Sequence, residues 1–159
     1  MLKYFVIGAS LTATAIFLAH NKDNTLTRDG KGVAKYLMKL GYSKSIASGI
    51  AGNLYVESKY DPMAVGDNGQ SFGLAQWHKS RWDALKEWSE KRGKPISDFK
   101  TQLDFIDWEL KNTENKASRL LNDTTNPHDS AFIFAKYYER PKHISEERMS
   151  KAVEIYQSL

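Results

Sequence analysis

The sequence contains no cysteine. This absence excludes a disulfide, a thiolate nucleophile and a cysteine-ligated metal site, but it does not fix the compartment in which the protein works. Internal repeats and low-complexity stretches are also missing. The 159 residues suit one globular domain with a short additional segment, and the 41% of hydrophobic residues suffices for one core.

Histidine is rare and scattered. The four histidines are His20, His78, His128 and His143, and none forms an HExxH motif or another pair with metal-ligand spacing. We therefore expect no metal and no other cofactor, and we interpret all four as surface or structural residues. A peptidase has little support, because the chain offers neither cysteine, nor a metal-binding histidine pair, nor a recognisable serine–histidine pattern.

A dense block of basic residues is absent as well. The chain carries 23 Lys and Arg against 19 Asp and Glu, a net charge of +4, and its densest basic stretch, residues 86–94, is interrupted by Glu87 and Glu90. Such diffuse charge is not typical of a nucleic-acid-binding arm, so we expect no nucleic-acid partner. An excess of positive charge favours anionic partners such as bacterial wall polymers or a membrane face.

The N-terminus begins with a charge-free run. Residues 4–19 follow Lys3 and carry no charge, and polarity returns abruptly at His20. A full membrane span takes about 17 to 25 residues, so the length of this run is marginal. Signal-peptidase cleavage is disfavoured, because Ala19 has the bulky Phe17 two positions before it.

This pattern predicts three segments. Residues 1–20 form an uncleaved signal-anchor or transmembrane segment, residues 21–28 a polar linker, and residues 29–159 a globular domain held outside the cytoplasm.

Hydrophobic periodicity predicts that this domain is mainly helical. Apolar residues such as Val33 and Leu37 recur at helical spacing along most of it. The expected helices cover about residues 29–40, 43–59, 79–92, 98–112, 128–139 and 145–158. Ser43, Ser97 and Ser145 precede three of them and are the expected N-caps.

One small β element interrupts the helices. Turn residues crowd the stretch after Asp61-Pro62, and Asn68-Gly69 between short flanks is a strong hairpin signal. We predict a small β-hairpin or β-loop over residues 64–76. The expected class is therefore mainly α, an α+β fold with one small hairpin.

Glu57 is the first candidate for chemistry. It follows Ile50 by seven residues and Leu54 by three, so on a helix it shares their apolar face. Desolvation raises the pKa of a glutamate, and a carboxyl still protonated near neutral pH can donate a proton to a glycosidic oxygen. From periodicity alone, a glutamate paired with Lys or Arg at a helix end is the better interpretation. The predicted hairpin after the helix favours the catalytic interpretation instead, because a helix that ends at a hairpin forms one wall of a polar cleft.

A family resemblance supports the cleft. Glu57-Ser58 followed by Gly66-Asp67-x-Gly69-x-x-Phe72-Gly73-Leu74-x-Gln76 resembles the goose-type lysozyme and lytic transglycosylase superfamily. The block LYVESKYDPMAVGDNGQSFGLAQW and the later stretch FAKYYERP are similar to the phage tail lysozyme family. The resemblance covers about residues 30–140 and implies a lysozyme-like fold.

The resemblance also implies roles. Glu57 is the catalytic acid, Ser58 orients its carboxyl group, and Gln76 with a hydroxyl from Tyr137 or Tyr138 contacts Glu57 or the sugar. Of the two tyrosines we favour Tyr138. The substrate-binding residues implied are Ser58, Ser71, Gln76 and Tyr138.

Whether the site has a second catalytic carboxylate separates a hydrolase from a lytic transglycosylase. An inverting hydrolase needs a base at about 6.5–9.5 Å from the acid, whereas a lytic transglycosylase uses the C6 hydroxyl of its own substrate. Asp67 aligns with an aspartate in the Gly-Asp-x-Gly turn of goose-type lysozymes, although Asp before Asn-Gly also simply builds a turn. His78 stands where those enzymes keep a further aspartate, which weakens the hydrolase interpretation; Asp61 is another candidate.

These observations predict a muramidase. It hydrolyses the β-1,4 bond between N-acetylmuramic acid and N-acetylglucosamine, with Glu57 and Asp67 as the catalytic pair, peptidoglycan as partner and the membrane as attachment. The alternatives are a lytic transglycosylase that leaves anhydro-muramyl ends and an inactive sugar-binding virion protein. We expect a phage protein acting in host lysis or wall penetration. The N-terminal run also resembles in composition the signal-arrest-release segments of some phage endolysins, so release from the bilayer is the alternative to a plain anchor. The oligomeric state is left open.

Overall fold

The computed structural model describes residues 26–159. The predicted anchor over residues 1–20 and most of the predicted linker lie outside the described residues. Within residues 26–159, no helix is long and apolar enough to cross a membrane.

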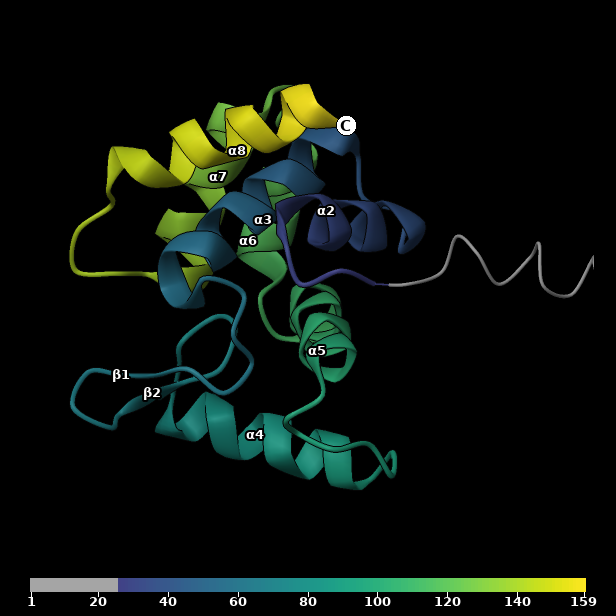
Figure 1. The fold of residues 1–159 in the computed structure, drawn as a ribbon, viewed down its shortest axis with the longest axis vertical. Helices are drawn as coiled ribbons and strands as arrows, with labels where there is room; N and C mark the ends of the chain where they lie inside the picture. Colours follow the sequence, from purple (N-terminus) through teal and green to yellow (C-terminus); the bar gives the residue numbers. More distant parts are fainter. Residues whose placement is uncertain (1–25) are drawn as a thin grey trace, which may run out of the picture.

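The described domain is mainly helical, as expected, and its β element is a small three-stranded sheet where a hairpin was predicted (Figure 1). The helices are α2 (Gly30–Lys39), α3 (Lys44–Ser58), α4 (Lys79–Glu90), α5 (Phe99–Asn112), α6 (Asn115–Asn122), α7 (Pro127–Phe134) and α8 (Glu146–Ser158), and a π-helical turn η1 (Ala135–Glu139) continues α7. The strands are β1 (Val65–Gly66), β2 (Ser71–Phe72) and β3 (Trp77–His78).

Helix α3 is the centre of the domain. It packs against α2, α7 and α8, and Ile50 and Leu54 on it are fully buried. Two glycines permit the close approach of its neighbours: a Cβ at Gly49 would lie 2.6 Å from Ser130 Cβ of α7, and one at Gly52 would lie 2.6 Å from the Arg148 carbonyl of α8. The C-terminal end of α3 is thereby fixed between α7 and α8 above and the strands below (Figure 1).

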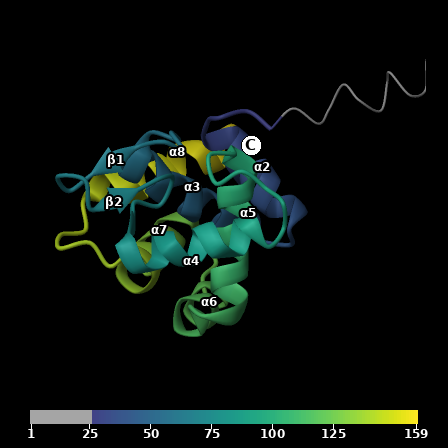
Figure 2. The same ribbon diagram turned by 90° about the horizontal axis from the view of Figure 1, so that it is seen from below.

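The three strands pair antiparallel in the order β1-β2-β3. Asp67, Asn68 and Gly69 make the first turn with φ of 48°, 54° and 87°, values that Asn, Asp and Gly tolerate best. The sheet lies at one end of the molecule, beside the first residues of α4 (Figures 1 and 2).

Buried Gln102 of α5 stabilises the loop after β2 through side-chain hydrogen bonds to its backbone and to that of Pro62. Its side-chain carbonyl accepts the Leu74 amide at 2.8 Å, and its amide donates to the Pro62 carbonyl at 2.8 Å. Gly73 has φ +71°, and a Cβ there would lie 2.6 Å from Gln102 Oε1. A glycine is therefore required for backbone and packing together.

Three local predictions need correction. Helix α6, which is short and polar, was not expected. The cap of α5 is Asp98, whose carboxylate accepts the Thr101 amide at 2.9 Å, and not Ser97. Ser145 stands at the N-cap of α8, but its side chain makes no capping hydrogen bond. The Ser43 cap of α3 is confirmed, since its hydroxyl accepts the Ile46 amide at 3.2 Å.

Candidate active site

Glu57, in the last turn of α3, is ion-paired with Arg148, in the first turn of α8. Arg148 Nη2 lies 2.6 Å from Glu57 Oε1, and the two side chains are 6% and 14% exposed. Buried Asn53 holds the arginine, because its Oδ1 accepts from Arg148 Nη1 at 3.0 Å while its amide donates to the Ala131 carbonyl at 3.0 Å. The ion-pair interpretation of Glu57 is therefore correct as a description of its contact.

The pairing does not make Glu57 an ordinary carboxylate. Burial raises its pKa above the usual value, the nearby charge of Asp67 raises it further, and Arg148 and His78 oppose the shift without reversing it. Glu57 thus combines the buried position expected from sequence with a proton affinity suited to a general acid.

Glu139 is a half-buried glutamate with a buried Oε1, and the sequence interpretation missed it. It ends η1, and burial raises its pKa well above the usual value, with the charge of Glu57 contributing in the same direction. It lies within FAKYYERP, and only the two tyrosines of this stretch were predicted to be site residues. The charged groups that act on it come from four other elements, so no local spacing indicates them.

Asp67 and Ser71 face each other across the hairpin turn. The Ser71 hydroxyl donates to Asp67 Oδ2, and Ser71 is 1% exposed. The prediction that Ser71 binds glycan is therefore not supported by its position, because its hydroxyl is buried and engaged. Asp67 itself is exposed and close enough to Glu57 for its charge to act there.

The side chains of Ser58 and Gln76 donate hydrogen bonds to backbone carbonyls around the site. The Ser58 hydroxyl donates toward the carbonyls of Leu54 at 3.1 Å and Leu74 at 2.9 Å. It ties α3 to the loop after β2 and does not orient the Glu57 carboxyl, contrary to the prediction. Half-buried Gln76, at φ 45°, donates from its amide to the Gly73 carbonyl at 3.0 Å, so this amide is engaged within the hairpin.

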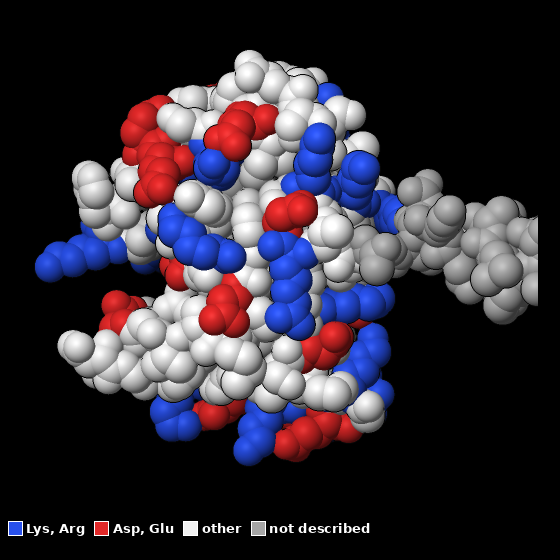
Figure 3. All heavy atoms as spheres, viewed as in Figure 1, with Lys and Arg blue, Asp and Glu red and all other residues white. Residues whose placement is uncertain are grey.

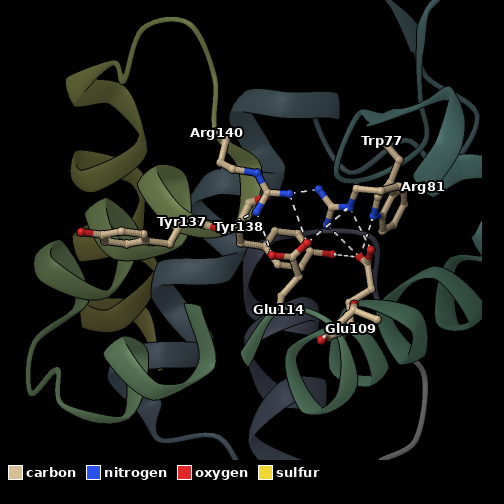
Figure 4. Close-up of polar contacts among 8 residues, drawn as sticks. Trp77, Arg81, Glu109, Glu114, Tyr137, Tyr138 and Arg140 are labelled. Atoms are coloured by element: carbon tan, nitrogen blue, oxygen red, sulfur yellow. Dashed lines mark hydrogen bonds and ion pairs between the residues drawn. The ribbon is translucent and has the colours of Figure 1, made fainter. Parts of the chain in front are cut away.

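Tyr138 belongs to a buried network around Glu109 (Figure 4). Arg81 grips the Glu109 carboxylate with Nε at 2.8 Å and Nη2 at 2.9 Å, and Trp77 Nε1 and the Tyr138 hydroxyl donate to it at 2.9 and 2.5 Å. Tyr138 is fully buried, so the prediction that it contacts the sugar is wrong. Tyr137 points away from this network in Figure 4 and lies against Lys116.

The surface is hollowed beside the sheet (Figure 3). A groove of about 450 Å³ is lined by Gly69, Gln70, Phe72, His78, Lys79 and Ser80. It takes its residues from the hairpin and the start of α4, and its lining includes none of the residues predicted to face the cleft, which are Glu57, Asp67, Ser71 and Gln76. Among residues 26–159, no group of three or more His, Cys, Asp or Glu side chains could hold a metal ion.

Comparison with known proteins agrees with the fold and the motifs. The sequence profile of the phage tail lysozyme family matches residues 30–159, and the chain belongs to this family. It is 27% identical over 128 residues to Morphogenesis protein 1 of Bacillus phage B103. The match covers 73% of this chain and 34% of that relative, so the chain spans about a third of the relative's length. The family supports a phage peptidoglycan-degrading enzyme, a glycosidase or a transglycosylase.

Proposed function

We propose that this protein hydrolyses the β-1,4 bond between N-acetylmuramic acid and N-acetylglucosamine in peptidoglycan, with Glu57 as the general acid. The observation that carries the proposal is a nearly buried glutamate with a raised pKa, where the central helix meets the hairpin. Such a carboxyl can remain protonated near neutral pH and can protonate a leaving-group oxygen.

The ion pair fits this role. Arg148 contacts Oε1 of Glu57, so the proton for catalysis is carried on Oε2. That proton passes to the glycosidic oxygen while its bond to the sugar carbon breaks and the electron pair stays on the oxygen. Arg148 then stabilises the carboxylate that forms. Fixed in turn by Asn53, the arginine keeps the carboxyl oriented through the cycle.

Asp67 is the proposed base that activates water. It is exposed on the hairpin, its carboxylate is oriented by the Ser71 hydroxyl, and its charge reaches Glu57. These features suit a carboxylate across a cleft from the acid.

A lytic transglycosylase is the second candidate. His78 is exposed at the N-cap of α4, on the wall of the groove, where goose-type enzymes keep a further aspartate. A site with fewer carboxylates is compatible with attack by the substrate's own C6 hydroxyl.

Product analysis separates the two reactions. Purified peptidoglycan is digested with the protein, and the soluble fragments are identified by mass spectrometry. Hydrolysis predicts fragments with reducing ends. Fragments that carry only 1,6-anhydro-muramyl ends would replace the hydrolase by the transglycosylase. A clear zone on a peptidoglycan zymogram excludes the inactive sugar-binding alternative.

We further propose that the enzyme is phage-encoded and acts in host wall penetration or host lysis. The relative named a morphogenesis protein favours a function connected with the particle. Presence of this protein in purified particles supports penetration, and its absence from them supports lysis.

A further inference from the structure

The Glu109 carboxylate binds donors from three other elements (Figure 4). It accepts from Trp77 of β3, from two nitrogens of Arg81 of α4 and from the Tyr138 hydroxyl of η1, all at 2.5–2.9 Å. Glu109 itself lies on α5 and is 3% exposed. A buried ion pair is weak evidence for stability, because apolar residues of similar volume often serve a fold as well. Its directional bonds, by contrast, fix how the elements that supply them lie relative to one another.

Two of these elements carry the groove. Residues 78–80 lie between Trp77 and Arg81 in the chain, and all three line the groove. A displacement of Trp77 or Arg81 would therefore move the groove wall with it. The charge of His78, within this stretch, acts on Glu57, so the groove wall is near the proposed acid.

The third element, η1, belongs to the part of the molecule that carries Glu57. It continues α7, and α7 packs against α3 and α8. Buried Asn53 of α3 donates to the Ala131 carbonyl of α7 and accepts from Arg148 of α8. Since Arg148 pairs with Glu57, the position of η1 is coupled to that of the acid.

The same two parts are also connected elsewhere. The hydroxyl of Ser58, at the end of α3, donates to the Leu74 carbonyl at 2.9 Å. The Glu109 network, with the bond from Arg81 Nη1 to the Tyr138 carbonyl at 3.2 Å, connects them through different elements. Apolar packing permits small sliding of one element past another, whereas hydrogen bonds at two different places fix the orientation.

We propose that Glu109 is a positioning residue, whose carboxylate holds the groove in a fixed orientation to Glu57, so that substrate bound in the groove presents its scissile bond to the acid. The inference rests on the proposed function of Glu57. A misplacement of about 1 Å can cost about 10²-fold in rate. Binding in the groove itself does not need this alignment. Loosening the network should therefore lower kcat and leave KM nearly unchanged.

The test is Tyr138→Phe, which loosens the network with little disturbance. It removes the hydroxyl that donates to Glu109 and keeps the ring, which stacks on Phe134 with centroids 4.3 Å apart. The pair between Arg81 and Glu109 also remains. We expect kcat on soluble peptidoglycan strands to fall about tenfold or more, and KM to change by less than about twofold.

The matched control is Tyr42→Phe. It also removes a tyrosine hydroxyl that donates to a carboxylate of α5, here Asp107 at 2.9 Å. Tyr42 lies between α2 and α3 and lines no part of the groove. The control should therefore keep its kcat. An equal loss of kcat in both variants would mark lost stability alone and overturns the proposal.

A second variant, Arg81→Lys, keeps the charge and loses the two-pronged contact with Glu109. It should lower kcat in the same way, again with little change in KM. Because both changes break one connection, the double variant should lose little more than either single variant. Losses that multiply would assign the two residues independent effects and would contradict a common positioning role.

The distance between two spin labels gives a reading that does not depend on activity. The chain contains no cysteine, so labels can be attached through Ala84→Cys on α4 and Ser150→Cys on α8, both at exposed positions. In pulsed electron paramagnetic resonance, the distance distribution should broaden or shift in Tyr138→Phe and stay unchanged in Tyr42→Phe.

An unaltered distribution in folded Tyr138→Phe overturns the proposal, as does an unchanged kcat. These outcomes differ from failure of the proposed function, which appears as full activity of Glu57→Gln.

Discussion

At the scale of single residues, the site is a set of carboxyl groups whose surroundings differ. Glu57 is nearly buried and paired, Glu139 has a buried oxygen without a donor, and Asp67 is exposed on a turn. Environments that separate the proton affinities of carboxyl groups define which can act as acid and which as base. These surroundings are the reason that we propose Glu57 as the acid and Asp67 as the base.

Asp67→Asn tests that assignment. Asparagine tolerates φ 48° as well as aspartate does and can accept the Ser71 hydrogen bond, so the turn should be retained. Loss of a general base is expected to lower kcat by about 10²-fold or more, with an unchanged melting temperature. Unaltered hydrolysis in this variant would restrict Asp67 to building the turn.

The sequence predicted Glu57 because helical periodicity placed a carboxylate on an apolar face. It did not predict Arg148 or Asn53, since their contact joins residues 95 positions apart. Tyr138 was placed in the cleft although it follows Phe134 by four residues. That spacing puts the two on one helix face, and both are fully buried.

At the scale of elements, the site depends on how closely α8 approaches α3. Arg148 reaches Glu57 because Gly52 lets the α8 backbone lie against α3. Most helix limits followed from periodicity and turn residues. The π-helical turn did not, because periodicity predicts one continuous helix over residues 128–139 and does not separate a π-helical turn from the α-helix that it continues.

Gly52→Ala tests this dependence. The added Cβ would lie 2.6 Å from the Arg148 carbonyl, a backbone atom that moves only with the helix. We expect α8 to shift, activity to fall more than tenfold and stability to drop by about 1–3 kcal/mol. The comparison variant is Gly30→Ala, whose Cβ would meet side-chain atoms only, Ile155 Cδ1 at 2.6 Å and Tyr60 Oη at 2.8 Å, and should therefore cost less than a contact with backbone. Equal and full activity of both variants would contradict the argument.

At the scale of the whole molecule, the residues before the described domain bear on where the protein is located. We propose that they anchor the protein in the membrane with the domain beside the wall, because residues 4–19 carry no charge and a polar segment follows. The full chain, expressed in a bacterial host, should stay in the membrane pellet after alkaline carbonate extraction. Complete release into the supernatant would contradict an anchor.

The central claim is that the Glu57 carboxyl supplies the proton that cleaves the glycan strand. The most direct measurement is the rate at which soluble muropeptides are released from purified peptidoglycan by Glu57→Gln, compared with the unmutated protein and with the exposed control Glu147→Gln. The variant should lose about 10²- to 10⁴-fold in rate while remaining folded, and the control should keep its rate. Release by Glu57→Gln at the unmutated rate would contradict the account.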